Sequence, residues 1–242
     1  TFSDPFMYTC FSKTPALSPS GDVRPYDQSG DGTVLGEGIG VVILKRLDEA
    51  RRDGDRIYAV IRSVGSSSDG KGTAIFAPSA EGQRRALLNT YENAGVDPGT
   101  VGLVEGHGTG TAVGDAVEVE DLNGVFRDSP RAGQGQPWCA LGSVKAQIGH
   151  TKAAAGAAGL IKAAMALHMK SLPPTAKVVN PLPSLVEAGS PFHLSTRLRP
   201  WISAGPRRAA VSAFGFGGSN FHCLLEESEP IGSHASAPAD LV

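Results

Sequence analysis

The chain has 242 residues, which is enough for one large domain or two small ones with a well-buried core. Its formal net charge of −2 favours neither a nucleic-acid partner nor an anionic membrane. The three cysteines are far apart without paired spacing, which indicates reduced thiols in a cytoplasmic protein rather than a disulfide framework. No segment reads as a signal peptide or a transmembrane helix. The chain lacks an initiator methionine, so we expect a fragment.

The first 26 residues are rich in Ser, Pro and Thr and show no sustained period, which predicts a loop with short helical turns. We expect three aromatic residues of this segment to be buried anchors: Phe6, Phe11 and Tyr26.

Glycines at positions 36, 38 and 40 precede a fully apolar run at residues 41–44, which we predict to be a strand. A dinucleotide-binding glycine loop follows a strand and opens a helix, and here that order is reversed. We therefore interpret these glycines as points of close backbone packing.

Predicted helices and strands alternate through the rest of the chain, joined by polar turns and irregular segments. The helices are expected at residues 47–52, 81–94, 115–126 and 151–169. The strands are expected at residues 57–64, 101–104, 140–144, 209–214 and 220–226, the last two as an antiparallel pair. The connecting segments are a polar turn at 66–72, a loose loop at 129–137, an irregular crossover at 180–198 and a disordered linker at 228–242. This order predicts an α/β fold with layered α/β/α architecture.

Two of the predicted strands end in turns that carry a histidine, and a third ends in a glycine-rich loop. The runs are GHGTGT at 106–111, ALGSVKAQIGH at 140–150 and SAFGFGGSN at 212–220. Open α/β sheets place their chemistry at the carboxyl ends of strands, so we expect His107, His150 and this loop at one pocket. The histidines could be metal ligands, bases, hydrogen-bond donors or core residues. A metal site is disfavoured because the sequence has no third ligand at the usual spacing. A serine hydrolase is disfavoured because the sequence contains no Gly-x-Ser-x-Gly run.

Four ordered motifs together resemble the β-ketoacyl synthases, the condensing domains of polyketide and fatty acid synthases, which have the thiolase fold. They are GHGTGT at 106–111, Gly114-Asp115, GSVKAQIGH at 142–150 and FGFGGSN at 214–220. The runs at 13–17, 65–71, 75–78 and 150–152 look like the iterative polyunsaturated-fatty-acid and enediyne type. Common modular polyketide synthases usually carry Glu where this chain has Lys152.

The resemblance implies a thiolase-like α/β/α fold, with residues 1–72 as the end of the N-terminal ketosynthase half and 73–227 as the C-terminal half. It implies an acyltransferase that joins an acyl thioester to malonyl-acyl carrier protein by decarboxylative Claisen condensation. No bound cofactor is implied, because the phosphopantetheine arm of the carrier protein brings the substrate. The complete domain would be a homodimer.

The resemblance also implies roles for individual residues. His107 and His150 would donate hydrogen bonds to the oxygen of the enolate formed on decarboxylation, where they would stabilise its charge. Lys145, placed on an apolar strand, would tune the site electrostatically. The remaining roles are phosphopantetheine binding by Thr109 and Thr111, support and helix capping by Asp115 and Glu118, an oxyanion-hole N–H and a gating ring from Phe216, and loop movement at Gly215, Gly217 and Gly218.

The family's nucleophilic cysteine, in a turn resembling Asp-Thr-Ala-Cys-Ser-Ser, would lie upstream of Thr1. Cys10 lacks the small neighbours and the following helix, while Cys139 and Cys223 lie in predicted strands. We therefore expect the chain to be inactive alone. A thiolase would need a second cysteine in the last glycine-rich loop, where this chain has Phe216. The alternative is a non-catalytic scaffold subunit of the chain-length-factor type. Such proteins typically lose the nucleophile or a histidine, so the two retained histidines favour an enzyme.

Overall fold

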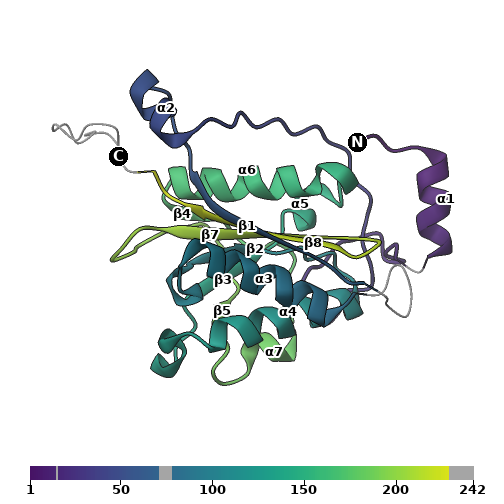
Figure 1. The fold of residues 1–242 in the computed structure, drawn as a ribbon. Helices are drawn as coiled ribbons and strands as arrows, with labels where there is room; N and C mark the ends of the chain where they lie inside the picture. Colours follow the sequence, from purple (N-terminus) through teal and green to yellow (C-terminus); the bar gives the residue numbers. More distant parts are fainter. Residues whose placement is uncertain (15, 71–77, 229–242) are drawn as a thin grey trace.

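A six-stranded mixed sheet forms the centre of the computed structural model, which describes residues 1–14, 16–70 and 78–228 (Figure 1). Its strand order is β1-β8-β7-β2-β3-β5, with β7, β2, β3 and β5 parallel and β1, β8 and β7 antiparallel. The strands are β1 (Val60–Ser68), β2 (Leu103–Glu105), β3 (Cys139–Gly142), β5 (Phe192–His193), β7 (Arg208–Gly215) and β8 (Ser219–Glu226). A separate two-stranded sheet pairs β4 (Ser171–Leu172) with β6 (Arg199–Pro200).

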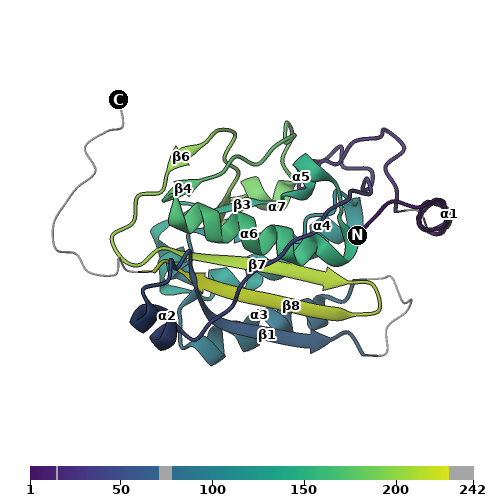
Figure 2. The ribbon, with the colours of Figure 1, turned by 90° about the horizontal axis from the view of Figure 1, so that it is seen from above.

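Helices cover both faces of the sheet, so the predicted layered α/β/α fold is confirmed (Figures 1 and 2). Helix α6 (Ala155–His168) packs on one face, and α3 (Ala80–Ala94) and α4 (Ala112–Arg127) pack on the other. The other helices are α1 (Pro5–Lys13), α2 (Leu47–Asp53), α5 (Lys145–Ile148) and α7 (Pro183–Val186), with 3-10 turns η1 (Pro98–Thr100), η2 (Pro130–Gln134) and η3 (Lys152–Ala154). Within the described residues, no helix is both long and apolar enough to cross a bilayer.

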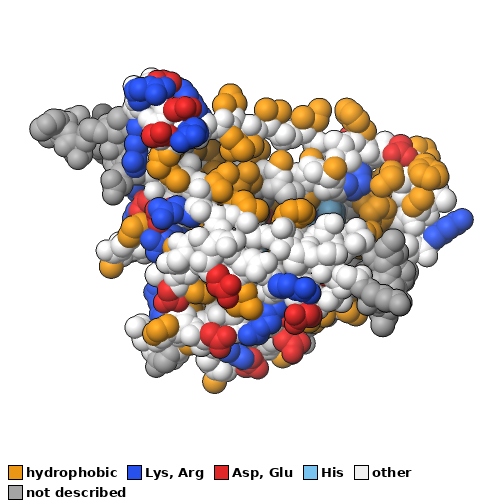
Figure 3. All heavy atoms as spheres, viewed as in Figure 1, with side chains coloured by type: hydrophobic (Ala, Val, Ile, Leu, Met, Phe, Trp, Pro, Cys, Tyr) orange, Lys and Arg blue, Asp and Glu red, His pale blue; other side chains and the backbone are white. Residues whose placement is uncertain are grey.

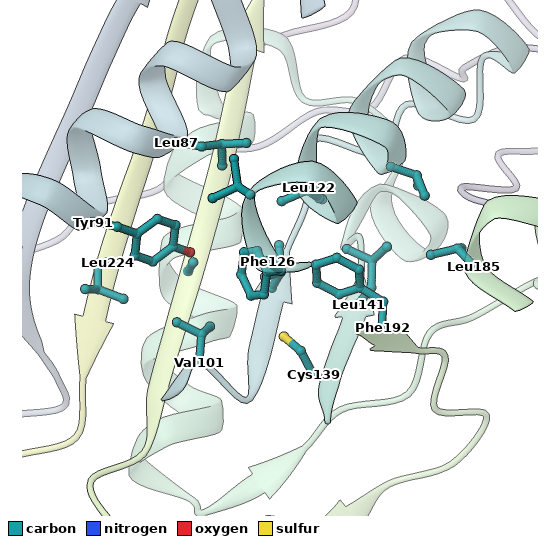
Figure 4. Close-up of a cluster of buried hydrophobic side chains, with 14 of the residues drawn as sticks. Leu87, Tyr91, Val101, Leu122, Phe126, Cys139, Leu141, Leu185, Phe192 and Leu224 are labelled. Carbon is teal, nitrogen blue, oxygen red and sulfur yellow. The ribbon is translucent and has the colours of Figure 1, made fainter. Parts of the chain in front are cut away.

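The central strands β2, β3 and β7 are buried on both faces along most of their length, because each face meets a layer of helices. Neighbouring residues of one strand therefore enter different cores. Leu103 packs beneath α6, whereas Val104 joins the cluster beneath α3 and α4, which Figure 4 shows around Phe126. On β8, Leu225 likewise packs in the cluster beneath α6, and Leu224 packs in the cluster beneath α3 and α4. This alternation follows from the two-residue period of a strand.

Several predicted elements have the expected type and nearly the expected bounds. Helix α2 ends at Gly54 and α3 ends at Gly95, and both glycines adopt the left-handed conformation typical of a C-terminal cap. The antiparallel pair β7 and β8 is confirmed. So is the close packing at two glycines: a Cβ on Gly36 would collide with the Ile148 carbonyl, and one on Gly40 would lie 2.9 Å from the Ala157 Cβ.

The strand predicted at residues 41–44 is wrong. The segment is extended but pairs with no other strand among the described residues, and its side chains are exposed, 79% for Val41 and 94% for Ile43. Figure 3 shows hydrophobic side chains gathered along this edge of the molecule, over α6. An apolar run indicates a tendency to be buried but cannot supply the partner that buries it.

The N-terminal segment is also more regular than predicted. It contains the nine-residue helix α1, which begins with Pro5 and is capped by Asp4, whose carboxylate accepts a 2.9 Å bond from the Met7 N–H. Tyr26 is fully buried as predicted, Phe11 is half-buried, and the burial predicted for Phe6 is wrong because its side chain is exposed.

Other corrections concern boundaries. Helix α4 begins at Ala112 rather than at residue 115, because Thr111 is already its N-terminal cap residue. Strand β1 starts later than predicted and continues to Ser68, so residues 66–68 are strand rather than turn. Lys145 begins the short helix α5 rather than ending a strand. Short ordered elements also interrupt the predicted loop and crossover, namely η2, α7 and β5. Residues 71 and 72, which end the predicted turn, residues 73–77 after it, and residues 229–242 of the predicted linker lie outside the described residues.

Candidate active site

The two histidines lie side by side, with their ring centroids 5.6 Å apart. His107 follows β2 by two residues, and His150 lies just beyond α5, the helix that follows β3. Phe214, near the end of β7, has its ring 5.7 Å from the His107 ring. The order β7-β2-β3 is parallel, so the carboxyl ends of these strands share one edge of the sheet. The structure therefore brings together the two histidines and the start of the glycine-rich loop.

The backbone determines which ring nitrogen carries the proton in each histidine. The Phe214 N–H donates a 3.3 Å bond to Nδ1 of His107. The Lys152 N–H donates a 3.0 Å bond to Nδ1 of His150. A backbone N–H can only donate, so both Nδ1 atoms are acceptors and the proton of each neutral ring is on Nε2. Each imidazole is thereby set up as an Nε2–H donor.

Both rings are held neutral by their surroundings. Burial, together with the positive charge of Lys145, lowers the pKa of His107 well below its ordinary value. Burial and the charges of Lys145 and Lys152 lower the pKa of His150 to about 3. Neutral imidazoles at physiological pH therefore act here as hydrogen-bond donors rather than as cations.

Lys145 lies beneath the His107 loop with only 4% of its surface exposed. Its Nζ donates a 2.5 Å bond to the carbonyl oxygen of His107. Burial lowers the pKa of Lys145, and the nearby carboxylates of Glu105, Glu118 and Asp115 oppose that shift. The residue therefore contributes both a fixed donor under His107 and a positive charge near the two rings.

Glu118 and Asp115 hold the loop that carries His107. The Glu118 carboxylate accepts bonds from the N–H groups of His107 (2.6 Å) and Gly108 (2.8 Å). The Asp115 carboxylate accepts bonds from the N–H groups of Thr109 (2.9 Å) and Gly110 (3.2 Å). Asp115 therefore fastens the loop before α4 rather than acting as the N-terminal cap residue predicted for it. Burial raises the pKa of both carboxyls, that of Asp115 to about 7, against the lowering effect of the amide donors.

The predicted phosphopantetheine-binding residues form a pair. Thr109 and Thr111 are both half-buried, and their hydroxyl oxygens are 2.9 Å apart. Between them Gly110 has a φ of 79°, a left-handed conformation that a side chain would strain. The loop thus presents two hydroxyl groups near His107.

The glycine-rich loop is the turn between β7 and β8. Phe216 is 63% exposed, and its ring stacks on that of Phe11 with a centroid distance of 5.8 Å. Gly217 and Gly218 both have positive φ, which the tight turn requires, while Gly215 is the last residue of β7. Phe216 is therefore an exposed aromatic residue with an aromatic neighbour from α1.

Neither Cys139, which is buried, nor Cys223, which is half-buried, is set up as a reactive thiolate. Burial raises the pKa of Cys139 far above its ordinary value and that of Cys223 to about 11. Cys10 is exposed on α1, within a helix rather than before one. In the part of the chain that the structure describes, no group of three or more His, Cys, Asp or Glu residues could hold a metal ion.

Some residues of the site were missed from the sequence. Tyr26 donates its backbone N–H to Asp115 (2.8 Å) and its hydroxyl to Glu118 (3.2 Å), but it is about 90 positions away and gave no signal of this role. The Phe214 and Lys152 backbone donors were likewise not foreseeable, because any residue has an N–H. Glu105 did carry a signal, since it is a charged residue at the end of an apolar strand.

Comparison with known proteins places these features in one family. A model described as "Beta-ketoacyl synthase, N-terminal domain" matches residues 2–50, and one described as "Beta-ketoacyl synthase, C-terminal domain" matches residues 58–179. A polyunsaturated fatty acid synthase polypeptide of Thraustochytrium sp. is 50% identical over 238 residues, which are 96% of this chain and 8% of that protein. Polyketide synthase PksL of Bacillus subtilis is 42% identical over 228 residues, or 93% of this chain and 5% of that protein.

A solved structure has the same fold. The ketosynthase from module 6 of the bacillaene synthase of Bacillus subtilis 168 matches with a TM-score of 0.90 and 40% sequence identity. The match covers 95% of this chain and 41% of that chain. The chain thus spans less than half of a solved ketosynthase and a small share of the curated relatives. The resemblance to the polyunsaturated-fatty-acid type agrees with the 50% identity to a synthase of that name.

Proposed function

Because the chain belongs to the β-ketoacyl synthase family, we propose that it supplies the decarboxylation site of a ketosynthase acting on malonyl-acyl carrier protein. The observation that carries this proposal is the pair of neutral imidazoles 5.6 Å apart, each with Nδ1 bonded to a backbone N–H. Both rings then present Nε2–H donors from one edge of the sheet. Preorganised donors of this kind stabilise negative charge that develops on a substrate oxygen.

In the proposed reaction, the bond between the α-carbon and the carboxylate carbon of the malonyl thioester breaks, and carbon dioxide leaves. The electron pair forms an enolate, whose thioester oxygen accepts bonds from His107 and His150. The α-carbon then attacks an acyl thioester held on a cysteine, and the cysteine thiolate leaves. Buried Lys145 adds a positive charge near the two rings, which would stabilise the developing oxyanion and lower the barrier.

The rest of the site would handle the substrate carrier. The paired hydroxyls of Thr109 and Thr111 would bond the amides of the phosphopantetheine arm on acyl carrier protein. The exposed ring of Phe216 would gate the acyl passage, and its N–H would serve the acyl oxyanion. Gly215, Gly217 and Gly218 would let this turn move. We place this chemistry in the cytoplasm, on a homodimer, with residues 1–72 ending one ketosynthase half and 73–227 forming the other.

The acyl-bearing cysteine, we propose, comes from a ketosynthase segment outside this chain. Cys139 and Cys223 have raised pKa values, and Cys10 lies inside helix α1. The exposed apolar segment at residues 41–44 is a surface that such a segment would cover. By itself the chain would then bind no acyl group and perform no condensation. The retained histidine pair favours this catalytic role over a scaffold function.

The test is substitution of each histidine in the complete protein that contains this chain. His107→Ala or His150→Ala should reduce carbon dioxide release from malonyl-acyl carrier protein by roughly 100- to 1000-fold, or about 3–4 kcal/mol, because each removes one oxyanion donor. Acyl loading of the cysteine, followed by mass spectrometry, should change far less. His168→Ala is the matched control, because His168 is exposed at the end of α6. Unchanged carbon dioxide release in both site variants would favour the scaffold function instead.

A further inference from the structure

A buried carboxylate lies directly under the site. Glu105 is the last residue of β2 and is almost fully buried. One of its oxygens accepts a 2.5 Å bond from the Val144 N–H, and the other accepts a 2.6 Å bond from Nζ of Lys162. Only 2% of the Glu105 side chain and 14% of the Lys162 side chain are exposed. The pair is therefore buried and hydrogen-bonded, unlike an ordinary surface ion pair.

Each partner of Glu105 belongs to a segment that carries part of the site. Glu105 itself is two residues before His107. Val144 directly precedes Lys145, whose Nζ bonds the His107 carbonyl. Lys162 is on α6, the helix that follows His150. The carboxylate thus joins the three segments that position both imidazoles and the lysine.

The packing of α6 is shaped around this contact. A Cβ on Gly159 would lie 3.2 Å from Cγ of Glu105 and 3.1 Å from Cγ1 of Val211. Both distances are tighter than ordinary van der Waals contact, so a side chain at this position would push the helix or its neighbours apart by a few tenths of an ångström. The glycine brings Lys162, one turn further along the same helix, within bonding distance of Glu105.

We propose that Glu105 is a positioning residue for decarboxylation. It fixes the relative positions of the His107 loop, the Lys145 segment and the helix after His150. This inference rests on the function proposed above. The carboxylate is chemically required because both partners are donors. A carboxylate offers two acceptor oxygens, whereas glutamine offers one oxygen and turns an NH₂ group toward the other donor. Glu105→Gln therefore breaks one of the two hydrogen bonds, from the Val144 N–H or from Lys162, while keeping the size of the side chain.

Three variants of the complete protein test this inference: Glu105→Gln, Lys162→Met and the double variant. We expect kcat for carbon dioxide release to fall roughly 10- to 100-fold in all three, because small misplacement of catalytic groups is costly. KM for malonyl-acyl carrier protein and the rate of acyl loading should stay within about twofold. Tm should fall in the single variants and recover in the double variant, which leaves no buried charge unpaired.

The double variant separates positioning from simple stabilisation of the fold. If its decarboxylation rate recovers together with Tm, the pair only stabilises the fold and the inference is wrong. The same conclusion follows if loading and decarboxylation fall in parallel. Glu227→Gln is the matched control, because Glu227 forms a partly buried 2.8 Å ion pair with Arg207 at the far end of β8. It should lower Tm without changing the ratio of decarboxylation to loading.

The histidine variants separate this inference from the proposed function. If His107→Ala abolishes decarboxylation but the Glu105 and Lys162 variants retain it, only the positioning role fails. If His107→Ala and His150→Ala both decarboxylate normally, the proposed function fails, whatever the Glu105 variants do.

Discussion

Acid should destabilise this protein partly through one buried histidine, His222. Its ring is fully buried within β8. Nδ1 lies 2.9 Å from the Ser212 hydroxyl and Nε2 lies 3.0 Å from the Tyr91 hydroxyl, so both nitrogens are paired with neutral groups. Burial lowers the pKa of this histidine to about 3. The folded protein therefore resists a proton that the unfolded chain accepts readily.

The size of the effect follows from the two pKa values. In the unfolded chain a histidine has a pKa of about 6.5, so between pH 6.5 and 3 the unfolded state binds more protons than the folded state. Stability from this group is complete above pH 6.5 and is lost as the pH falls. At pH 5 the unfolded state gains about 2 kcal/mol from protonation, and the loss approaches about 5 kcal/mol below pH 3.

Urea denaturation of the complete protein at pH 7.5 and pH 5.0 measures this loss. His222→Gln keeps one acceptor and one donor for the two hydroxyls but cannot be protonated. Between pH 7.5 and pH 5.0 the free energy of unfolding should fall in both proteins, and the fall in the wild type should be larger by about 2 kcal/mol. Other titrating groups cancel in the difference. His168→Gln, an exposed substitution on α6, should behave like the wild type. Equal losses in the wild type and His222→Gln would refute the reasoning.

Two further predictions concern the site and the isolated chain. Lys145→Met removes a positive charge that lowers the pKa of both site histidines, so the pKa of each histidine should rise. As the pH is lowered, carbon dioxide release should therefore begin to decline at a higher pH than in the wild type, because a protonated Nδ1 repels its backbone donor. An unshifted pH profile would contradict the electrostatic role. The purified 242-residue chain should self-associate in light scattering, because Val41, Ile43 and Leu44 are exposed. It should also elongate no acyl thioester, because the nucleophile is supplied elsewhere. A monodisperse, active chain would disprove both expectations.

Much of the fold was already present in local sequence patterns. Helical spacing ending at a glycine predicted α3, and two short strand-like runs joined by a glycine-rich loop predicted the antiparallel pair β7 and β8. The two histidines were predicted at one edge of a sheet because each follows a strand. Such features depend on periods of two or 3.6 residues and on turn chemistry, which lie within a short window of the chain.

Tertiary structure decided what the site residues do to one another. The proton position on His107 depends on the Phe214 N–H, which is 107 residues away, and the support of Asp115 and Glu118 depends on Tyr26. The pairing of Glu105 with Lys162 and the exposure of residues 41–44 were equally invisible locally. The physical reason is that spatial neighbours in the sheet, such as β7 and β2, are far apart in the chain. Hydrogen bonds, burial and pKa values arise between such neighbours, whereas helical and strand periods arise within one segment.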